Sequence, residues 1–304
     1  FGGLTGAVWA LAINLVFNWL INHMAIRKEA YKHKITLTLK KCSSELPILW
    51  RFSLPSVLSS AMVAPVTWAC NAMLVKKPGG YGELGILTAT LIFQHLLQFA
   101  SGMMNAPLLS MVSHAGTNIS ERLGAINILS TWIFGVIFAI PLLCFPEIIK
   151  ALFGASFDTR SFTLTFSIVM FYTTIIMYKA GLARVLAANN LLWWGFLSNA
   201  LWAIFLMVSA VFLVKWGAPG LAASFAMAYI LNTIIFVPLY YSRNLVPKGT
   251  IISFEAAIIW CVLLGLVLLN IADVPLLFRS IAFLPCMILT GIAFMRIYKG
   301  KPMA

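Results

Sequence analysis

The sequence predicts an all-α fold, a polytopic transmembrane helical bundle of about nine helices. Of the 304 residues, 62% are hydrophobic and 10% are charged, and the mean hydropathy is +0.96. Soluble domains are about 45–50% apolar and about 25% charged. A chain of this composition has too few polar residues to cover its apolar ones in water, so we expect lipid to be its solvent.

The apolar stretches are long enough to cross a bilayer, which takes roughly 20 predominantly apolar residues. They show no strand-like alternation and are too long for the strands of a membrane β-barrel. The longest gap between them, residues 25–49, is too short for a soluble domain. In chain order the predicted helices are 2–24, 50–75, 84–113, 124–145, 161–186, 191–215, 220–240, 253–272 and 275–297.

The first and seventh predicted helices share a pattern. GLTGAVWALAINLVFN and GAPGLAASFAMAYILN match at a constant offset, at Gly3 and Gly217, Gly6 and Gly220, Ala12 and Ala226, and Asn18 and Asn232. Parallel repeats of this kind build two-lobed transporters whose halves rock around a central site. The alternative is that small residues recur because they let helices approach closely.

The repeat predicts the domain organisation. The chain opens at Phe1 without an initiator Met or a basic signal-peptide segment, so we expect a fragment whose first lobe is mostly missing. The predicted parts are the last helix of the N-terminal lobe (1–24), a basic cytoplasmic connector (25–49), a six-helix C-terminal lobe (50–243), and two additional helices with a tail (244–304).

The net charge of +13 is divided unequally between alternate loops, which argues against nucleic-acid binding. The richer side is predicted to be cytoplasmic, together with the C-terminus. It holds Arg27, Lys28, Lys32, Lys34, Lys40, Lys41, Arg51, Arg122, Lys179, Arg184, Arg243, Lys248, Arg296, Lys299 and Lys301. The other side holds Lys76, Lys77, Lys150, Arg160, Lys215 and Arg279.

Polar side chains follow one face of the predicted helix 84–113. Thr90, Gln94, Gln98, Ser101 and Asn105 recur at steps of three or four residues. Polar groups at membrane depth tend to face the bundle interior or a water-filled path. The stripe therefore predicts a cavity wall, with hydrogen bonding between helices as the alternative. His95, at the margin of this face, is a secondary candidate.

Other uncharged polar groups extend this prediction. Amides and aromatic rings suit a sugar, because they bind hydroxyls and stack on C–H faces. Candidates of this kind are Asn14, Asn18, Asn71, Tyr172, Asn199 and Asn232, with rings from Trp68, Trp132 and Trp202. Many Trp residues are alternatively anchors at the membrane interface.

Ionisable residues are distributed unevenly. The eight acidic residues map to loops or helix ends, at Glu29, Glu45, Glu83, Glu121, Glu147, Asp158, Glu255 and Asp273. Arg51, Lys179 and Arg184 lie close to or within the helices and suit an anionic head group such as a diphosphate. The alternative is that they extend to inner-leaflet phosphates. The five cysteines show no metal or redox spacing, so no metal site or cofactor is predicted.

Four short segments resemble a known family. They are Phe52-Ser-Leu-Pro-Ser-Val-Leu-Ser59 with Pro65 and Trp68, Gly79-Gly-Tyr-Gly-Glu-Leu-Gly85, Pro107-Leu-Leu-Ser110, and the stretch FPEIIKALFGASF from Phe145 to Phe157. Together they look like bacterial O-antigen and polysaccharide-unit flippases, of the superfamily that includes multidrug exporters. The resemblance covers nearly the whole chain, from the family's sixth helix onward.

The resemblance implies a transporter of the bacterial inner membrane and not an enzyme. It implies that an undecaprenyl-diphosphate-linked oligosaccharide crosses from the cytoplasmic to the periplasmic leaflet by alternating access. We expect Arg51, Lys179 and Arg184 to attract the diphosphate, with inner-leaflet anionic lipids and polysaccharide assembly proteins as further partners. The residues expected to meet sugars are Gln94, Gln98, Asn105, His95, Tyr172, Asn199 and Asn232.

Two other functions stay open. A cation-coupled multidrug exporter would be expected to carry carboxylates within the membrane. A membrane glycan polymerase or glycosyltransferase would call for a large extramembrane loop or a carboxylate-rich motif, whereas the loop 146–160 offers only Glu147 and Asp158.

Overall fold

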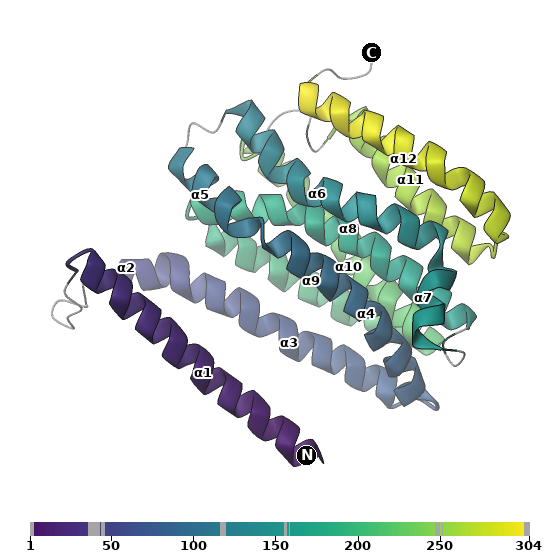
Figure 1. Ribbon diagram of the computed structural model, residues 1–304, viewed down its shortest axis with the longest axis horizontal. Coiled ribbons are helices and arrows are strands. Elements are labelled where there is room, and N and C mark those ends of the chain that lie inside the picture. Colours follow the sequence, from purple (N-terminus) through teal and green to yellow (C-terminus); the bar gives the residue numbers. More distant parts are fainter. Residues whose placement is uncertain are drawn as a thin grey trace. The chain divides into compact units, whose positions relative to one another are not determined.

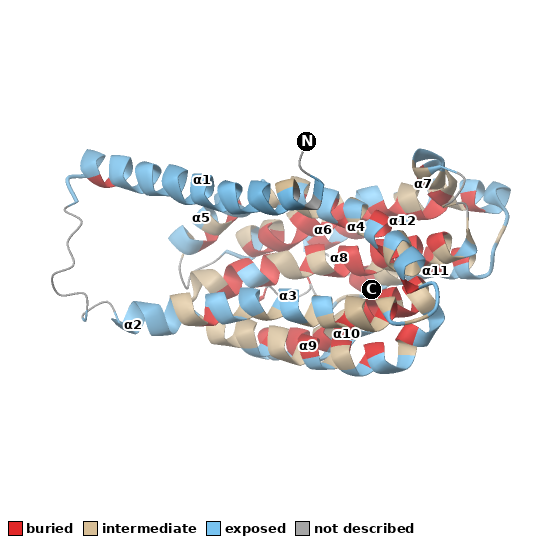
Figure 2. Cartoon of the chain, turned by 90° about the horizontal axis from the view of Figure 1, so that it is seen from below, coloured by how far each residue is buried: buried red, intermediate tan, exposed pale blue. Residues whose placement is uncertain are grey.

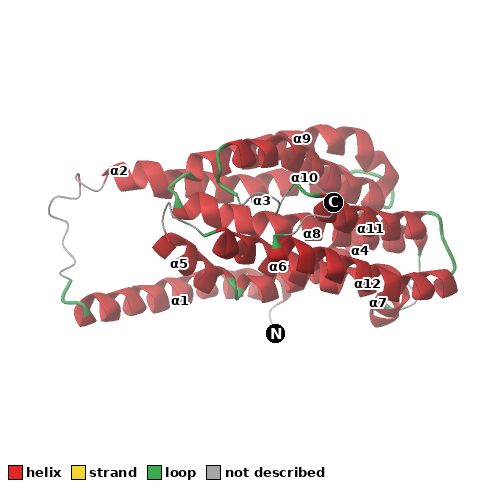
Figure 3. Cartoon of the chain, turned by 90° about the horizontal axis from the view of Figure 1, so that it is seen from above, coloured by secondary structure: helices red, strands yellow, loops and turns green. Residues whose placement is uncertain are grey.

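In the computed structural model, helices joined by short connections make up the described part of the chain, and no strand occurs in it (Figure 3). This part comprises residues 3–35, 43, 46–115, 120–154, 157, 159–246, 250 and 252–300. It divides into two compact units, Phe1–Ile48 and Leu49–Ala304. The residues named individually above that lie outside the described part are Phe1, Lys40, Lys41, Glu45, Asp158, Lys248 and Lys301.

The first unit contains α1 (Gly3–Lys32) and the short α2 (Leu46–Ile48). α1 continues beyond the predicted end at residue 24, so the start of the predicted connector is helical. The extension carries charged side chains, and Glu29 and Lys32 form an ion pair one turn apart at 3.1 Å. Within α1, the Asn18 amide donates to the Asn14 side-chain oxygen at 3.5 Å.

The second unit is a bundle of helices (Figure 1). In order they are η2 (Leu49–Ser53), α3 (Leu54–Val75), α4 (Gly80–Gly102), α5 (Asn105–Ala115), α6 (Glu121–Cys144), α7 (Pro146–Phe153), α8 (Arg160–Ala188), α9 (Leu192–Leu213), η4 (Val214–Trp216), α10 (Gly217–Ser242), α11 (Phe254–Ile271) and α12 (Leu276–Lys299).

The described residues contain eight stretches that are long and apolar enough to cross a membrane. One of them, Leu192–Ser242, includes both α9 and α10. When it is counted as two helices, the described residues contain nine, in the same order as the nine predicted helices. The predicted polytopic helical bundle is confirmed. Apolar side chains such as Ile204, Val208 and Phe212 remain exposed on the outer face of α9, as a surface in contact with lipid requires.

One helix that was predicted to be continuous is interrupted in the structure. The stretch 84–113 is divided into α4 and α5 by a turn at Met103 and Met104. Gly102 has a low helix propensity, and the hydroxyl of Ser101 donates to the Gln98 carbonyl at 3.1 Å, a side-chain bond that competes with the backbone hydrogen bonds of a helix. A second difference is that the short helix α7 occupies part of the predicted loop 146–160.

Helix α8 is the centre of the bundle. It packs against α4, α6, α10 and α11, and it is the most buried of the candidate spans (Figure 2). Its contact with α6 is close at Gly181, where an added Cβ would lie 2.8 Å from the Cα of Ile128. Two hydrogen bonds reinforce the contact: the Asn127 amide donates to the Gly181 carbonyl and the Thr131 hydroxyl donates to the Met177 carbonyl, each at 2.8 Å.

The carboxylate of Glu83 ties α4 to two other helices at one end of the bundle. It accepts hydrogen bonds from the backbone N–H of Ala218 at 2.6 Å and from the Ser161 hydroxyl at 3.3 Å. A negative charge at the N-terminus of α10 is favourable because the first backbone N–H groups of a helix have no partner within it. Gly217 begins α10 at φ 70°, and the matching Gly3 begins α1 at φ 52°.

We predict that Gly181→Ala lowers the thermal unfolding midpoint of the purified protein in detergent, through overpacking of about 1–3 kcal/mol against α6. Gly265→Ala in α11 is the matched control, because its added Cβ would meet nothing within 4 Å. That variant should be as stable as the wild type or slightly more stable. Equal midpoints for the two variants would contradict the close α6–α8 contact.

Candidate functional site

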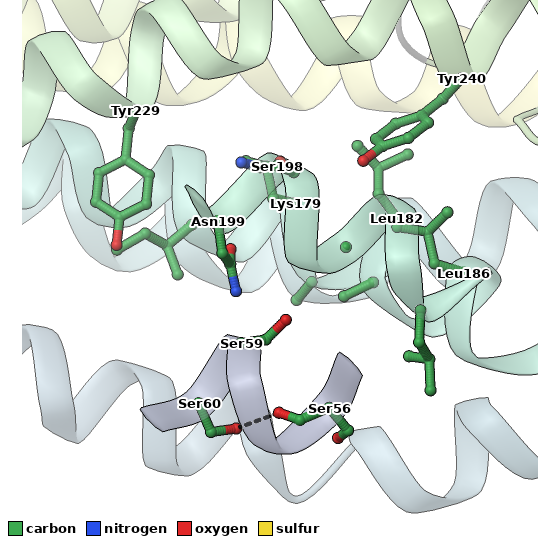
Figure 4. A pocket seen from close by; sticks show the side chains of 15 residues that line it. Ser56, Ser59, Ser60, Lys179, Leu182, Leu186, Ser198, Asn199, Tyr229 and Tyr240 are labelled. Atoms are coloured by element: carbon green, nitrogen blue, oxygen red, sulfur yellow. Dashed lines mark hydrogen bonds between the residues drawn. The ribbon is translucent and has the colours of Figure 1, made fainter. Parts of the chain in front are cut away.

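A cavity of about 400 Å³ opens between α3, α8, α9 and α10. It lies toward the end of the bundle where α8 ends and α9 begins, since Leu186 and Leu192 are among its walls. Serines of α3 lie on one side and face Asn199 of α9 (Figure 4). The polar lining consists of Ser56, Ser59, Ser60, Lys179, Ser198, Asn199, Tyr229 and Tyr240.

Lys179 places a positive charge at this cavity with uncharged partners. Its ammonium group donates to the side-chain oxygen of Asn232 and lies 6.0 Å from the ring centroid of Tyr229. Asn232 is held in place by Ser198, whose hydroxyl donates to the same oxygen at 3.1 Å and whose carbonyl accepts from the Asn232 amide at 2.7 Å. No ion pair joins Lys179 to a carboxylate among the described residues.

This arrangement leaves the lysine able to bind an anion. A lysine ammonium has three N–H donors, and Asn232 accepts one of them. A charge within a membrane-spanning helix is costly without a counter-charge, and such residues commonly mark a substrate or ion path. An anionic group in the cavity would supply the missing counter-charge.

Arg184 is placed differently from Lys179. It is 5% exposed and does not line the cavity. Its guanidinium donates to the Asn127 side chain at 2.6 Å, to the Asn127 carbonyl, to the Thr131 hydroxyl at 3.3 Å and to the Asn105 side chain at 2.5 Å. These bonds connect α8 to α6 and α5.

The three cations predicted to bind a diphosphate are therefore not brought together within this unit. Lys179 lines the cavity, Arg184 donates to uncharged acceptors on another face of α8, and Arg51 is exposed in η2.

The polar stripe predicted on helix 84–113 contributes no residue to the walls of this cavity. Thr90 and Ser101 are buried and donate to carbonyls of their own helix. Gln94 is also buried, and its side-chain oxygen has no hydrogen-bond partner among the described residues. The remaining members and their neighbour are the half-buried Gln98, Asn105, which accepts from Arg184, and the exposed His95.

The other predicted sugar-binding residues lie at or near the cavity. Asn199 lines it, Asn232 orients Lys179, and Tyr172 is buried with its ring stacked on Tyr229 at 5.7 Å. Of the predicted aromatic rings, Trp202 packs on Tyr229, Trp132 is buried against Trp260, and Trp68 is exposed.

Sequence reasoning missed the serines of α3, the two cavity tyrosines and Asn127. Ser56, Ser59 and Ser60 share the i, i+3, i+4 spacing of one helix face, which is the signal that could have found them. Asn127 and Thr131 are likewise four residues apart. No group of three or more His, Cys, Asp or Glu that could hold a metal ion occurs in the part of the chain that the structure describes.

Comparison with known proteins shows a weak likeness to a polysaccharide export protein. The chain is 22% identical over 192 residues to the EPS I polysaccharide export inner membrane protein EpsE of Ralstonia nicotianae. The match covers 61% of this chain and 43% of that protein, so the chain spans less than half the length of this relative. No protein-family model and no solved structure match the chain.

We predict that Arg184→Gln destabilises the purified protein by about 3 kcal/mol, because it leaves the buried acceptors of Asn127 and Thr131 on α6 without their donor. Arg243→Gln is the control, since Arg243 is exposed and stacks on Trp194 at 4.5 Å, where loss is about 1 kcal/mol or less. Thermal unfolding in detergent measures both. An Arg184→Gln protein of wild-type stability would mean that Arg184 does not hold the helices together.

Proposed function

We propose that the chain belongs to a bacterial inner-membrane transporter that moves a diphosphate-linked oligosaccharide lipid from the cytoplasmic to the periplasmic leaflet by alternating access. The observation that carries the proposal is the cavity among membrane-spanning helices, in which Lys179 lies beside hydroxyl and amide groups with no described carboxylate partner. Likeness to a protein named for polysaccharide export supports it. The four sequence segments that resemble polysaccharide-unit flippases support it as well.

The chemistry of the lining fits such a cargo. Lysine acts on a phosphate as a point charge with rotatable donors. Ser59, Ser198 and Asn199 offer hydroxyl and amide groups for sugar hydroxyls, while the apolar walls suit the region where the polyprenyl chain joins the head group.

The charge distribution supports loading of the cargo from the cytoplasmic side. The cavity lies near the α8–α9 connection, on the side of the bundle whose loops are richer in Lys and Arg. By the positive-inside rule, we take this side to be cytoplasmic. A lipid-linked sugar assembled at the inner leaflet would therefore enter from this end.

A positive cavity favours an anionic cargo over a cationic drug. None of the residues that line the cavity is Asp or Glu, and an exporter of cationic drugs would need such a charge there. The multidrug-exporter alternative is therefore the weaker proposal for this unit. No bond-forming or bond-breaking step is part of the transport that we propose.

We predict that Lys179→Gln, in cells that depend on the gene encoding this chain, lowers surface polysaccharide at least about tenfold, as loss of a charge-assisted hydrogen bond implies. The lipid-linked intermediate should accumulate. Lys179→Arg keeps the charge and should retain most of the transport.

Lys215→Gln is the control, because Lys215 is exposed beside Trp216 and lies outside the cavity. Membrane protein levels are measured for each variant. Undiminished polysaccharide from Lys179→Gln, at wild-type protein levels, would overturn the proposal.

A further inference from the structure

An aromatic cluster adjoins the cavity on the side away from the α8–α9 connection. It consists of Tyr172 from α8, Trp202 from α9, and Phe225 and Tyr229 from α10. Tyr172 stacks on Tyr229 at 5.7 Å and on Phe225 at 5.9 Å, and Trp202 packs on Tyr229 at 5.5 Å. Tyr229 belongs to both the cluster and the cavity wall.

The helix faces that line the cavity lead to this cluster. On α9, Trp202 lies three and four residues beyond Asn199 and Ser198, so the three share one face. On α8, Tyr172 lies seven residues before Lys179 and four before Ile176, which is also a wall residue. The polar path of the cavity and the aromatic cluster are therefore parts of one interior surface.

Two polar groups in the cluster have no partner. The hydroxyl of Tyr172 and the indole N–H of Trp202 are buried and lack a hydrogen-bond partner among the described residues. Their side chains are 1% and 4% exposed. Buried donors without acceptors destabilise a fold, and nearly all buried polar groups in native structures are paired.

Packing alone does not account for these groups. A phenylalanine at position 172 would keep the ring stacking and would carry no unpaired hydroxyl. The donors become favourable in a state of the protein in which acceptors reach them. An acceptor could come from a ligand that enters between the helices.

We infer that Tyr172, Trp202 and Tyr229 form a sugar-binding site that is closed in this structure and receives a pyranose ring when α8, α9 and α10 separate. This inference rests on the proposed function and deepens it. The aromatic faces stack on the C–H faces of the ring, as they stack on one another here. The Tyr172 hydroxyl and the Trp202 N–H donate to sugar oxygens, so the glycan passes from the cavity near Lys179 to this site.

The test removes single polar groups from the full-length protein in cells. Tyr172→Phe deletes one hydroxyl, so the unfolding midpoint should be unchanged or higher. Transport, measured as surface polysaccharide against accumulated lipid-linked intermediate, should fall about three- to tenfold, as the loss of one or two hydrogen bonds implies. Trp202→Phe, which keeps an aromatic ring but removes the N–H, should lower transport in the same way.

Tyr178→Phe is the matched control. Tyr178 lies on the same helix and is buried, but its ring packs on Trp132 and Trp260, away from the cavity. Its substitution should leave transport unchanged.

The possible results distinguish failure of the sugar site from failure of the proposed function. Wild-type transport by Tyr172→Phe and Trp202→Phe would overturn the sugar site and leave the proposed function standing. A lower midpoint for Tyr172→Phe would show that its hydroxyl has a structural partner, and this result would also overturn the site. If the wild-type gene does not restore polysaccharide, the proposed function itself fails.

Discussion

The function proposed for this protein depends on the positive charge that Lys179 places beside the cavity. In a bilayer, a charged or polar group must find its partners within the protein, because the acyl chains offer none. Asn232, which Ser198 holds in place, and the ring of Tyr229 lie beside the ammonium group without neutralising it. The bundle thus holds a charge beside a cavity, where an anion can approach it.

Lys179 and Arg184 show two uses of a cation in one helix. They are five residues apart, which is about 140° around a helix with 3.6 residues per turn, so they face different neighbours. The planar guanidinium of Arg184 donates hydrogen bonds to Asn105, Asn127 and Thr131 and so connects helices. The ammonium of Lys179 donates to Asn232 and has further N–H donors for a ligand. The packed side of α8 therefore stabilises the bundle while the other side forms the cavity.

The fold could be predicted from the sequence because hydropathy reports directly on the solvent of each helix. The order and number of membrane helices followed from it. The break at Met103 did not, since it depends on local hydrogen bonding at Ser101 and on the bond between Asn105 and Arg184, which are 79 residues apart. Among the candidate site residues, Lys179, Asn199 and Asn232 lie at the cavity. The serines of α3 were missed because a hydroxyl in a helix can bond to its own backbone and does not stand out from an apolar stretch.

The central claim is that the cavity is reached by water and carries the uncompensated charge of Lys179. The most direct measurement is the rate at which Asn199→Cys reacts with an anionic and a cationic methanethiosulfonate reagent of similar size, above the labelling of the unsubstituted protein. The account predicts that the anionic reagent reacts at least about fivefold faster, as expected for a unit charge nearby in an aqueous cleft, and that Lys179→Gln removes this preference. No reaction with either reagent, or a preference that Lys179→Gln leaves unchanged, would contradict it.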